Sequence, residues 1–151
     1  MKQNQVLVVM QGPSGGGKST LAKHLKVLLE AMGHTVRICS TDDQFCVDGT
    51  YQFDPTKLST YHAINQRLAE EALERGESVI VDNTNLACWE AKPYVVAAHK
   101  KDIAVSFHRC DGNFKNVHGV PDFKVAQMKS RMEPLSVEGC LTAKAPWERV
   151  G

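Results

Sequence analysis

The stretch GPSGGGKST, residues 12–20, decides the fold of this chain. It follows the apolar run Val6–Gln11, and its first eight residues match the pattern G-x-x-x-x-G-K-[ST]. Glycine lets successive backbone N–H groups turn toward an anion at a place where a Cβ would block the approach. The stretch therefore predicts a loop that wraps the phosphates of a nucleotide.

Each residue of this loop has an expected task. The helix that begins near Lys18 should point the positive end of its dipole at the phosphates. Lys18 should reach the β- and γ-phosphates, and the hydroxyl of Ser19 should bind Mg²⁺. The predicted ATP-binding residues are Gly12, Pro13, Ser14, Gly15, Gly16, Gly17, Lys18, Ser19 and Thr20. The motif predicts a nucleoside triphosphate site but does not specify the reaction.

Composition places few other limits on function. The chain has 151 residues, 42% of them hydrophobic, and a formal net charge of +1, which fits one soluble domain spanning residues 1–151. Acidic residues outnumber Lys and Arg between positions 42 and 90, and the balance is reversed between positions 99 and 131. The basic region could face a phosphate-rich ligand or be a solvated helix face.

Cysteine spacing and the N-terminus bear on location. The five cysteines form no C-x-x-C pair, which favours reduced thiols in a cytoplasmic protein without structural zinc. The first apolar run is too short for a signal peptide, and no segment is long enough to span a membrane. We therefore expect no membrane partner. If a phage encodes the chain, the location would be the host cytoplasm.

Apolar runs alternate with longer amphipathic stretches along the chain. Strands are expected at 6–11, 35–39, 78–82 and 103–107, and helices at 18–32, from 54 to 76, from a cap at Thr84 or Asn85 to 99, and at 121–132. Strands separated by helices predict an α/β fold with a parallel sheet and helices on both faces. The tail from Pro134 is ambiguous.

Polar clusters follow the first three predicted strands. They are GPSGGGKST, then Ser40-Thr41-Asp42-Asp43, then Asp82-Asn83-Thr84-Asn85. Ligands of such folds collect at the carboxyl ends of the strands, so we expect the three clusters to meet there.

The second cluster supplies a candidate base. A carboxylate at Asp42 could accept the proton of an attacking hydroxyl, although Asp pairs after strands are often turns or caps. Asp43 is a candidate substrate contact or an N-cap.

In the third cluster, Asp82 could hold Mg²⁺ directly or through its water, or cap a helix. Asn83, Thr84 and Asn85 could orient a substrate or serve as caps.

Phosphoryl transfer also needs positive charge near the departing group. Candidates are Arg109, Arg131, Lys115, Lys124 and Lys129. A lone histidine is more often a surface or core residue than a catalyst, so we assign no role to His108 or His118.

Five stretches of the sequence, taken in order, resemble the polynucleotide-kinase-like P-loop kinases, which include the phage 5′-polynucleotide kinases. They are GPSGGGKST, STDDQF, YQFDPTKL, VIVDNTNL and VHGVP. The resemblance runs from about Val6 to Glu133. It implies a P-loop NTPase-type sheet with strand order 2-3-1-4 and a helical lid, at about residues 109–133, that covers ATP. It also implies a base that maps onto Asp42.

The chain departs from this family at two places. Relatives often have arginine just before N-x-H-G-V-P, where this chain has Phe114 and Lys115. Lysine keeps the charge but loses the planar fork that grips phosphate. Some relatives carry arginine shortly after the base, where this chain has Phe45, a ring that could stack on a base or sugar.

The leading hypothesis is a kinase that moves the γ-phosphate of ATP to a hydroxyl of a nucleic acid, with DNA favoured over RNA. The acceptor would be a 5′-hydroxyl end or the hydroxymethyl group of a modified pyrimidine in DNA. Reaching a base would suit the rings of Phe45, Tyr51 and Phe53, although such rings more often pack a loop. The alternatives are a kinase for a free nucleoside or small molecule, and a nucleotide-dependent switch without phosphotransfer. The oligomeric state stays open.

Overall fold

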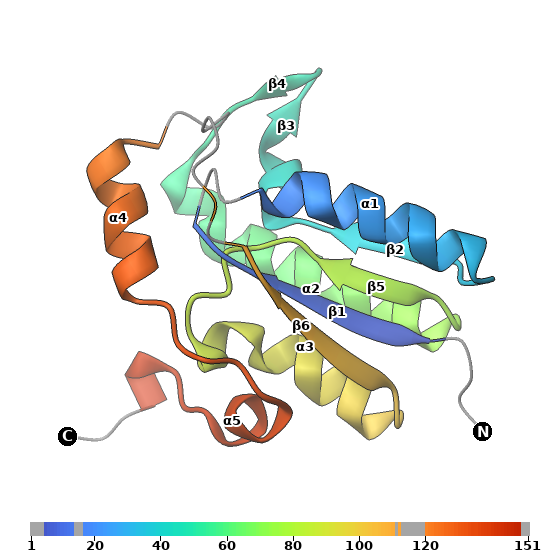
Figure 1. The fold of residues 1–151 in the computed structure, drawn as a ribbon. Helices are drawn as coiled ribbons and strands as arrows, with labels where there is room; N and C mark the ends of the chain where they lie inside the picture. The colour runs from blue at the N-terminus through green and yellow to red at the C-terminus, as the bar shows by residue number, and fades with distance from the viewer. Residues whose placement is uncertain (1–4, 14–16, 111, 113–119, 149–151) are drawn as a thin grey trace.

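The computed structural model describes residues 5–13, 17–110, 112 and 120–148. A parallel four-stranded sheet lies at its centre, with its strands in the order β2-β5-β1-β6 (Figure 1). The strands are β1 (Val6–Gln11), β2 (Val36–Cys39), β5 (Ser78–Val81) and β6 (Ala104–Arg109). Along the chain these are the first, second, third and fourth strands of the sheet. The predicted order 2-3-1-4 is therefore confirmed.

Different helices cover the two faces of the sheet, because side chains along a strand alternate in direction. Val8 and Met10 pack in a core cluster with apolar side chains of α1. Leu7 and Val9 pack in a second cluster with side chains of α2, α3 and α5. The helices are α1 (Lys18–Ala31), α2 (Leu58–Glu74), α3 (Cys88–Lys100), α4 (Asp122–Ser130) and α5 (Val137–Thr142). Strand β1 is thus covered on both sides, which explains its continuous apolar sequence.

Two of the predicted helix ends lie where glycine follows. Helix α1 ends before Gly33, with φ 98°, and α2 ends before Gly76, with φ 90°. Both are left-handed conformations that glycine adopts without strain. The start of α2 differs from the prediction, since the short 3₁₀ helix η2 (Pro55–Lys57) precedes it. The Asp54 side chain caps this turn by accepting from the N–H of Thr56 at 3.0 Å.

Helix α3 begins later than predicted, so the expected cap at Thr84 or Asn85 is wrong. The helix starts at Cys88, and the N–H of Ala87 donates to Glu90 Oε2 at 2.9 Å. Asn85 instead holds a left-handed turn with φ 43°, and its side-chain amide donates to the carbonyl of Met10 at 2.8 Å. The side chain that was predicted to cap the helix therefore makes a tertiary contact to β1 instead.

A small hairpin rises beyond the carboxyl end of β2 (Figure 1). It follows the 3₁₀ helix η1 (Thr41–Phe45) and pairs β3 (Cys46–Val47) with β4 (Thr50–Tyr51) in antiparallel fashion. Asp48 and Gly49 form its turn with φ 50° and 79°, as a two-residue Asp-Gly hairpin requires. The sequence analysis did not predict this hairpin.

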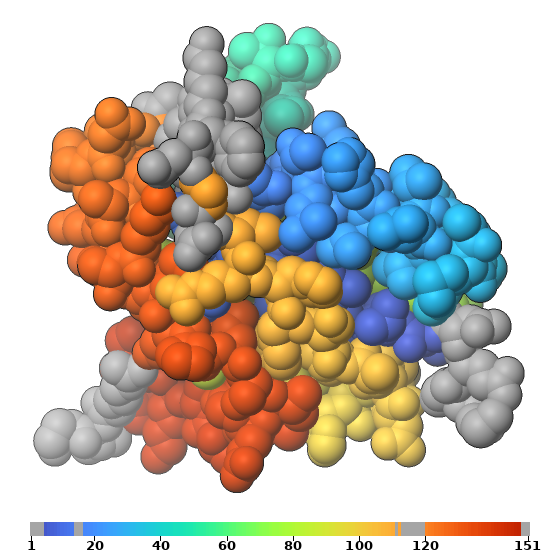
Figure 2. All heavy atoms as spheres, viewed as in Figure 1, coloured from blue at the N-terminus to red at the C-terminus, as the bar shows by residue number. Residues whose placement is uncertain are grey.

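The C-terminal third supplies α4, α5 and the 3₁₀ helix η3 (Pro146–Glu148). Helix α4 stands beside the end of the sheet where the strands stop, and residues of β6 reach the surface between α4 and α1 (Figure 2). The tail that the sequence left ambiguous packs on α3. Cys140 is fully buried, and the Trp147 and Trp89 rings meet edge to face with centroids 5.2 Å apart.

Candidate functional site

The described ends of the phosphate loop are tightly constrained. Gly12 lies directly after β1, and its N–H donates to the carbonyl of Thr84 at 3.0 Å. A Cβ at Gly12 would overlap the carbonyl oxygen of Cys110, so this position excludes any side chain. Gly17 has φ 92° and caps the N-terminus of α1. Three predicted loop residues, Ser14, Gly15 and Gly16, lie outside the described residues.

Lys18 is the first residue of α1, and its ammonium donates to the carbonyl of Pro13 at 3.0 Å. Burial lowers the pKa of Lys18, and the negative charges of Asp82 and Asp42 oppose that effect. The N–H of Gly12 bonds to Thr84 and the hydroxyl of Ser19 bonds to Asp82, so the third predicted cluster meets the phosphate loop. The bond from Thr41 to Asn83 joins the second cluster to the third.

Ser19 and Asp82 are in direct contact. The hydroxyl of Ser19 donates to Oδ2 of Asp82 at 2.8 Å, and the N–H of Asp82 donates to the carbonyl of Cys39 at 2.9 Å. Asp82 is buried, whereas Ser19 opens to solvent. A hydroxyl and a carboxylate are ligands that Mg²⁺ prefers, so this pair fits one magnesium ion.

Few protein ligands surround this pair. Among the described residues, no group of three or more His, Cys, Asp or Glu side chains could hold a metal ion by itself. That is expected for Mg²⁺ bound to a nucleotide, because the phosphates and water supply most of its ligands. Thr20 lies on the exposed surface next to Ser19.

The segment that carries Asp42 is fixed through its neighbour Thr41. The N–H of Thr41 donates to Oδ1 of Asn83 at 2.9 Å, and its hydroxyl lies 3.0 Å from Nδ1 of His62. Thr41 is 3% exposed, so these bonds hold a buried residue. Burial lowers the pKa of His62, which favours the neutral ring, while the charge of Asp42 acts in the opposite direction.

The bonds from Thr41 to Asn83 and His62 form what we call the Thr41 clamp, and a second layer of polar contacts lies beneath it. The hydroxyl of Tyr94, from α3, accepts from Nδ2 of Asn65 at 2.9 Å and from Nδ2 of Asn83 at 3.4 Å. Asn65 comes from α2 and is 1% exposed. Helices α2 and α3 and the end of β5 thus hold the start of η1 together.

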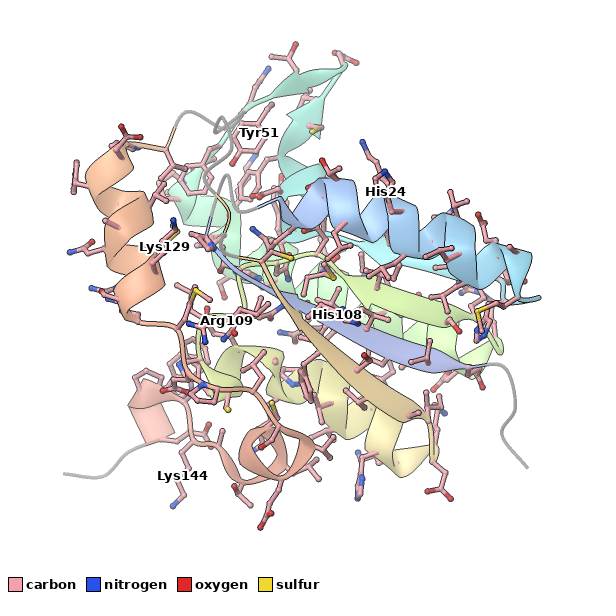
Figure 3. The ribbon with its side chains drawn as sticks, viewed as in Figure 1. His24, Tyr51, His108, Arg109, Lys129 and Lys144 are labelled. Atoms are coloured by element: carbon pink, nitrogen blue, oxygen red, sulfur yellow. The ribbon has the colours of Figure 1, made fainter. Side chains whose placement is uncertain are left out.

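Asp42 itself is half-buried on η1 and faces the hairpin. The hydroxyl of Tyr51 donates to Oδ1 of Asp42 at 3.4 Å. Figure 3 shows Tyr51 on the hairpin. Asp42 therefore has Tyr51 on one side and the Thr41 clamp on the other. Asp43, one residue later, is exposed.

Two predicted substrate residues have structural roles. Phe45 is 1% exposed and forms the centre of an aromatic cluster, so its ring has no face to offer a substrate. The exposed ring of this cluster is Phe53, whose centroid lies 5.1 Å from that of Phe45. Asn85 is 2% exposed, and its side-chain amide donates to the backbone carbonyls of Met10 and Asn83.

The other predicted substrate residues differ in position. Asn83 supports Thr41 and is partly accessible, and Thr84 is partly accessible at the same strand end. Lys115 lies outside the described residues.

The cationic side chains predicted for the site lie at different positions relative to the strand ends. Arg109 pairs in register with Gln11, and the Gln11 amide donates to the carbonyls of Leu86 and Glu133, away from α1. Residues in register share a face of the sheet, so Arg109 starts on the face opposite α1. Arg131 is exposed at the C-terminus of α4. Lys129 lies on the side of α4 that faces the strand ends (Figure 3).

Sequence reasoning considered only the ring of Tyr51 and missed the contact of its hydroxyl with Asp42, and it gave no role to His62. The hairpin signal Asp48-Gly49 could have placed Tyr51 next to the strand pair, because such dipeptides mark two-residue turns. His62 carried no signal beyond its place on the inner side of a helix. Its role depends on the packing of α2 against η1.

Comparison with known proteins assigns the family. A family model described as an AAA domain matches residues 7–113. This chain belongs to that AAA domain family. This chain is 41% identical, over 133 residues, to NEDD4-binding protein 2 of Homo sapiens. That match covers 82% of this chain but 7% of the relative, so the chain spans a small part of the relative's length.

Solved structures share the fold of this AAA domain. The APS kinase CysC of Mycobacterium tuberculosis superposes with a TM-score of 0.56 at 15% identity, covering 86% of this chain and 98% of that one. A structure of a Pnkp1/Rnl/Hen1 complex gives a TM-score of 0.56 at 18% identity, covering 82% and 38%. Kti12 of Chaetomium thermophilum, in complex with ADP-AlF3, gives 0.55 at 14% identity, covering 85% and 80%. The fold is therefore that of the P-loop kinase-like proteins.

None of the helices within the described part of the chain has both the length and the apolar character needed to cross a lipid bilayer.

Proposed function

We propose that this AAA domain is an ATP-dependent phosphotransferase with a hydroxyl acceptor. The observation that carries the proposal is that the phosphate loop and the Asp42 segment are tied to the same strand end, through the Ser19–Asp82 bond at 2.8 Å and the Thr41–Asn83 bond at 2.9 Å. A switch protein needs the loop and its Ser–Asp pair. A carboxylate directed at the same place is what a hydroxyl acceptor requires in addition.

The donor side would hold ATP through backbone amides of the loop and the Lys18 ammonium. Ser19 and Asp82 would hold Mg²⁺, which when bound neutralises charge on the β- and γ-phosphates. Asp42 would then accept the proton of the acceptor hydroxyl as its oxygen attacks the γ-phosphorus. The bond from that phosphorus to the bridging oxygen breaks, and ADP leaves with the electron pair.

For the acceptor we propose a nucleic acid, with DNA favoured. The motif series that resembles polynucleotide kinases supports this assignment, and so does the exposed Phe53 ring beside the Asp42 segment, because a ring can stack on an unpaired base. Both a 5′-hydroxyl end and a base hydroxymethyl group fit this chemistry. A free nucleoside is the second candidate.

The acceptor experiment uses ATP labelled in the γ-phosphate. The protein is offered 5′-hydroxyl oligonucleotides, duplex DNA with hydroxymethyluracil, and a nucleoside mixture. Label on the oligonucleotides or the modified DNA, and none on the nucleosides, is the expected result. Label on nucleosides alone would replace the nucleic-acid acceptor, and ATP binding without label on any acceptor would favour a switch.

We further propose that residues of about 109–133 form a lid and that α4 supplies its positive charge. Lys129 faces the strand ends (Figure 3). Lys124 is exposed, and because an α-helix turns once about every 3.6 residues, it lies on another side of the same helix. Lys129→Ala should lower kcat by about tenfold to a hundredfold, because charge on the departing phosphoryl group acts in the transition state. Lys124→Ala is the matched control and should stay within about twofold of wild type.

Arg109→Ala and Arg131→Ala complete this set. If kcat falls in only one of these two variants, that arginine and not Lys129 supplies the positive charge of the lid. Equal rates in all four variants would exclude Arg109, Lys124, Lys129 and Arg131 as the source of the lid charge.

A further inference from the structure

The Asp42 carboxylate has a neighbour whose role the proposed reaction does not yet include. The Tyr51 hydroxyl donates to Oδ1 of Asp42 at 3.4 Å. The two side chains come from different elements, η1 and β4, and the turn at Asp48-Gly49 brings them together. The hairpin therefore delivers a hydrogen-bond donor to one oxygen of the carboxylate.

Packing holds this donor in place. The Phe45 ring lies at the centre of the cluster, with centroids 6.3 Å from Tyr51, 5.1 Å from Phe53 and 4.6 Å from Tyr61. The N–H of Gln52 also donates to the carbonyl of Phe45 at 2.8 Å. Because Phe45 is buried, the hairpin is anchored to the domain next to Asp42.

The donor keeps its proton. Burial, the charge of Asp42 and the hydrogen bond to Asp42 raise the pKa of Tyr51 to about 12. The hydroxyl is therefore protonated wherever a carboxylate base operates. A donor of this kind favours the ionised form of the carboxylate and fixes its orientation.

We propose that Tyr51 is a positioning residue, whose hydroxyl holds Oδ1 of Asp42 so that the acceptor hydroxyl delivers its proton to Oδ2. This inference rests on the proposed function of Asp42 as the base. The 3.4 Å separation is long for an O–H···O bond, and such bonds commonly tighten when the substrate binds. In the proposed step the new bond joins the acceptor oxygen to the γ-phosphorus, ADP takes the bonding electrons, and Asp42 takes the proton.

The first test compares two tyrosine variants. Tyr51→Phe keeps the ring in the aromatic cluster but removes the donor, so kcat should fall by about tenfold while KM for ATP stays within about twofold. The acid limb of the pH–rate profile should move to higher pH, since the ionised carboxylate loses a stabilising donor. Tyr61→Phe removes a hydroxyl from the same cluster and should leave both unchanged. A Tyr51→Phe enzyme with the rate and the acid limb of wild type would overturn the inference.

The second test does not depend on activity. The tyrosines are labelled with ¹³C at Cζ, and Tyr51→Phe identifies the Tyr51 signal. In wild type this signal should remain that of the phenol up to about pH 11. In Asp42→Asn it should titrate at lower pH, because the carboxylate no longer raises the Tyr51 pKa. The same titration in both proteins would show that the contact is absent and would overturn the inference.

The two tests separate this inference from the function on which it rests. If wild type transfers phosphate, Asp42→Asn does not, and Tyr51→Phe matches wild type, only the role of Tyr51 fails. If wild type transfers no phosphate to any acceptor, the proposed function fails and the positioning role fails with it. The NMR titration then reports solely on the Tyr51–Asp42 contact.

Discussion

The phosphate-binding half of the site and the acceptor half differ in how far along the chain their parts lie. On the phosphate side, Gly12, Gly17, Lys18 and Ser19 come from one continuous segment, and Asp82 is the main distant contribution. On the acceptor side, the short helix η1 depends on partners from three other elements. A continuous strand–loop–helix builds its own geometry, whereas a discontinuous site needs the whole domain to pack first.

Because the two halves are built separately, substitutions in each half should impair different properties. The largest expected effect is on the turnover rate. Asp42→Asn should keep KM for ATP within about twofold and lower kcat by about a thousandfold, because a general base acts mainly in the transition state. Lys18→Ala should weaken ATP binding as well as turnover. Steady-state kinetics and ATP calorimetry on both variants measure the contrast. An Asp42→Asn variant that turns over normally would remove the distinction between donor and acceptor halves.

The next effect concerns how rigid the phosphate side is. Gly12→Ala should lower the free energy of unfolding by about 3 kcal/mol, since the new Cβ overlaps the Cys110 carbonyl. Gly49→Ala on the hairpin is the control. Nothing lies within 4 Å of its Cβ, and the cost is about 1 kcal/mol for the left-handed conformation alone. Urea denaturation of the two variants measures both costs, and equal losses would contradict the steric account.

A smaller effect should appear at the acceptor clamp. Asn83→Ala removes the acceptor of the buried Thr41 N–H and should lower the free energy of unfolding by about 1–2 kcal/mol. Because Thr41 precedes Asp42, kcat should fall as well, with little change in KM for ATP. Chemical denaturation and kinetics on the same preparation check both. Lost stability with a wild-type kcat would mean that the clamp does not position Asp42.

The smallest effect is the pH dependence of His62. Burial lowers its pKa in the folded protein, so the unfolded chain binds the proton more tightly. The His62 contribution to stability is complete above the unfolded value of about 6.5 and declines as pH falls from there toward the lower folded value. Because the ring is partly exposed, the change should stay below about 1 kcal/mol.

His62→Gln tests this sign, since glutamine is neutral at every pH. Urea denaturation at several pH values should show a shallower loss of stability below about pH 6.5 in His62→Gln than in wild type. Identical slopes would place the acid sensitivity elsewhere.

The success of the sequence predictions follows the same division. The strand order was predicted correctly from the resemblance to the polynucleotide-kinase-like P-loop kinases, and both glycine-terminated helices were predicted correctly from local conformational preferences. The cap at Thr84 or Asn85 was wrong because Asn85 bonds to a strand 75 positions earlier. Phe45 was assigned to substrate stacking because its burial depends on a hairpin that was not predicted.

By itself the sequence determined the α/β fold, the phosphate loop and the presence of acids after the second and third strands. Those features are local, since each depends on residue types within a few positions of one another. The tertiary structure alone decided that Asp82 meets Ser19, and that Asn83 and His62 hold Thr41. Such contacts join residues far apart in the chain, and their distances are set by how the helices pack on the sheet.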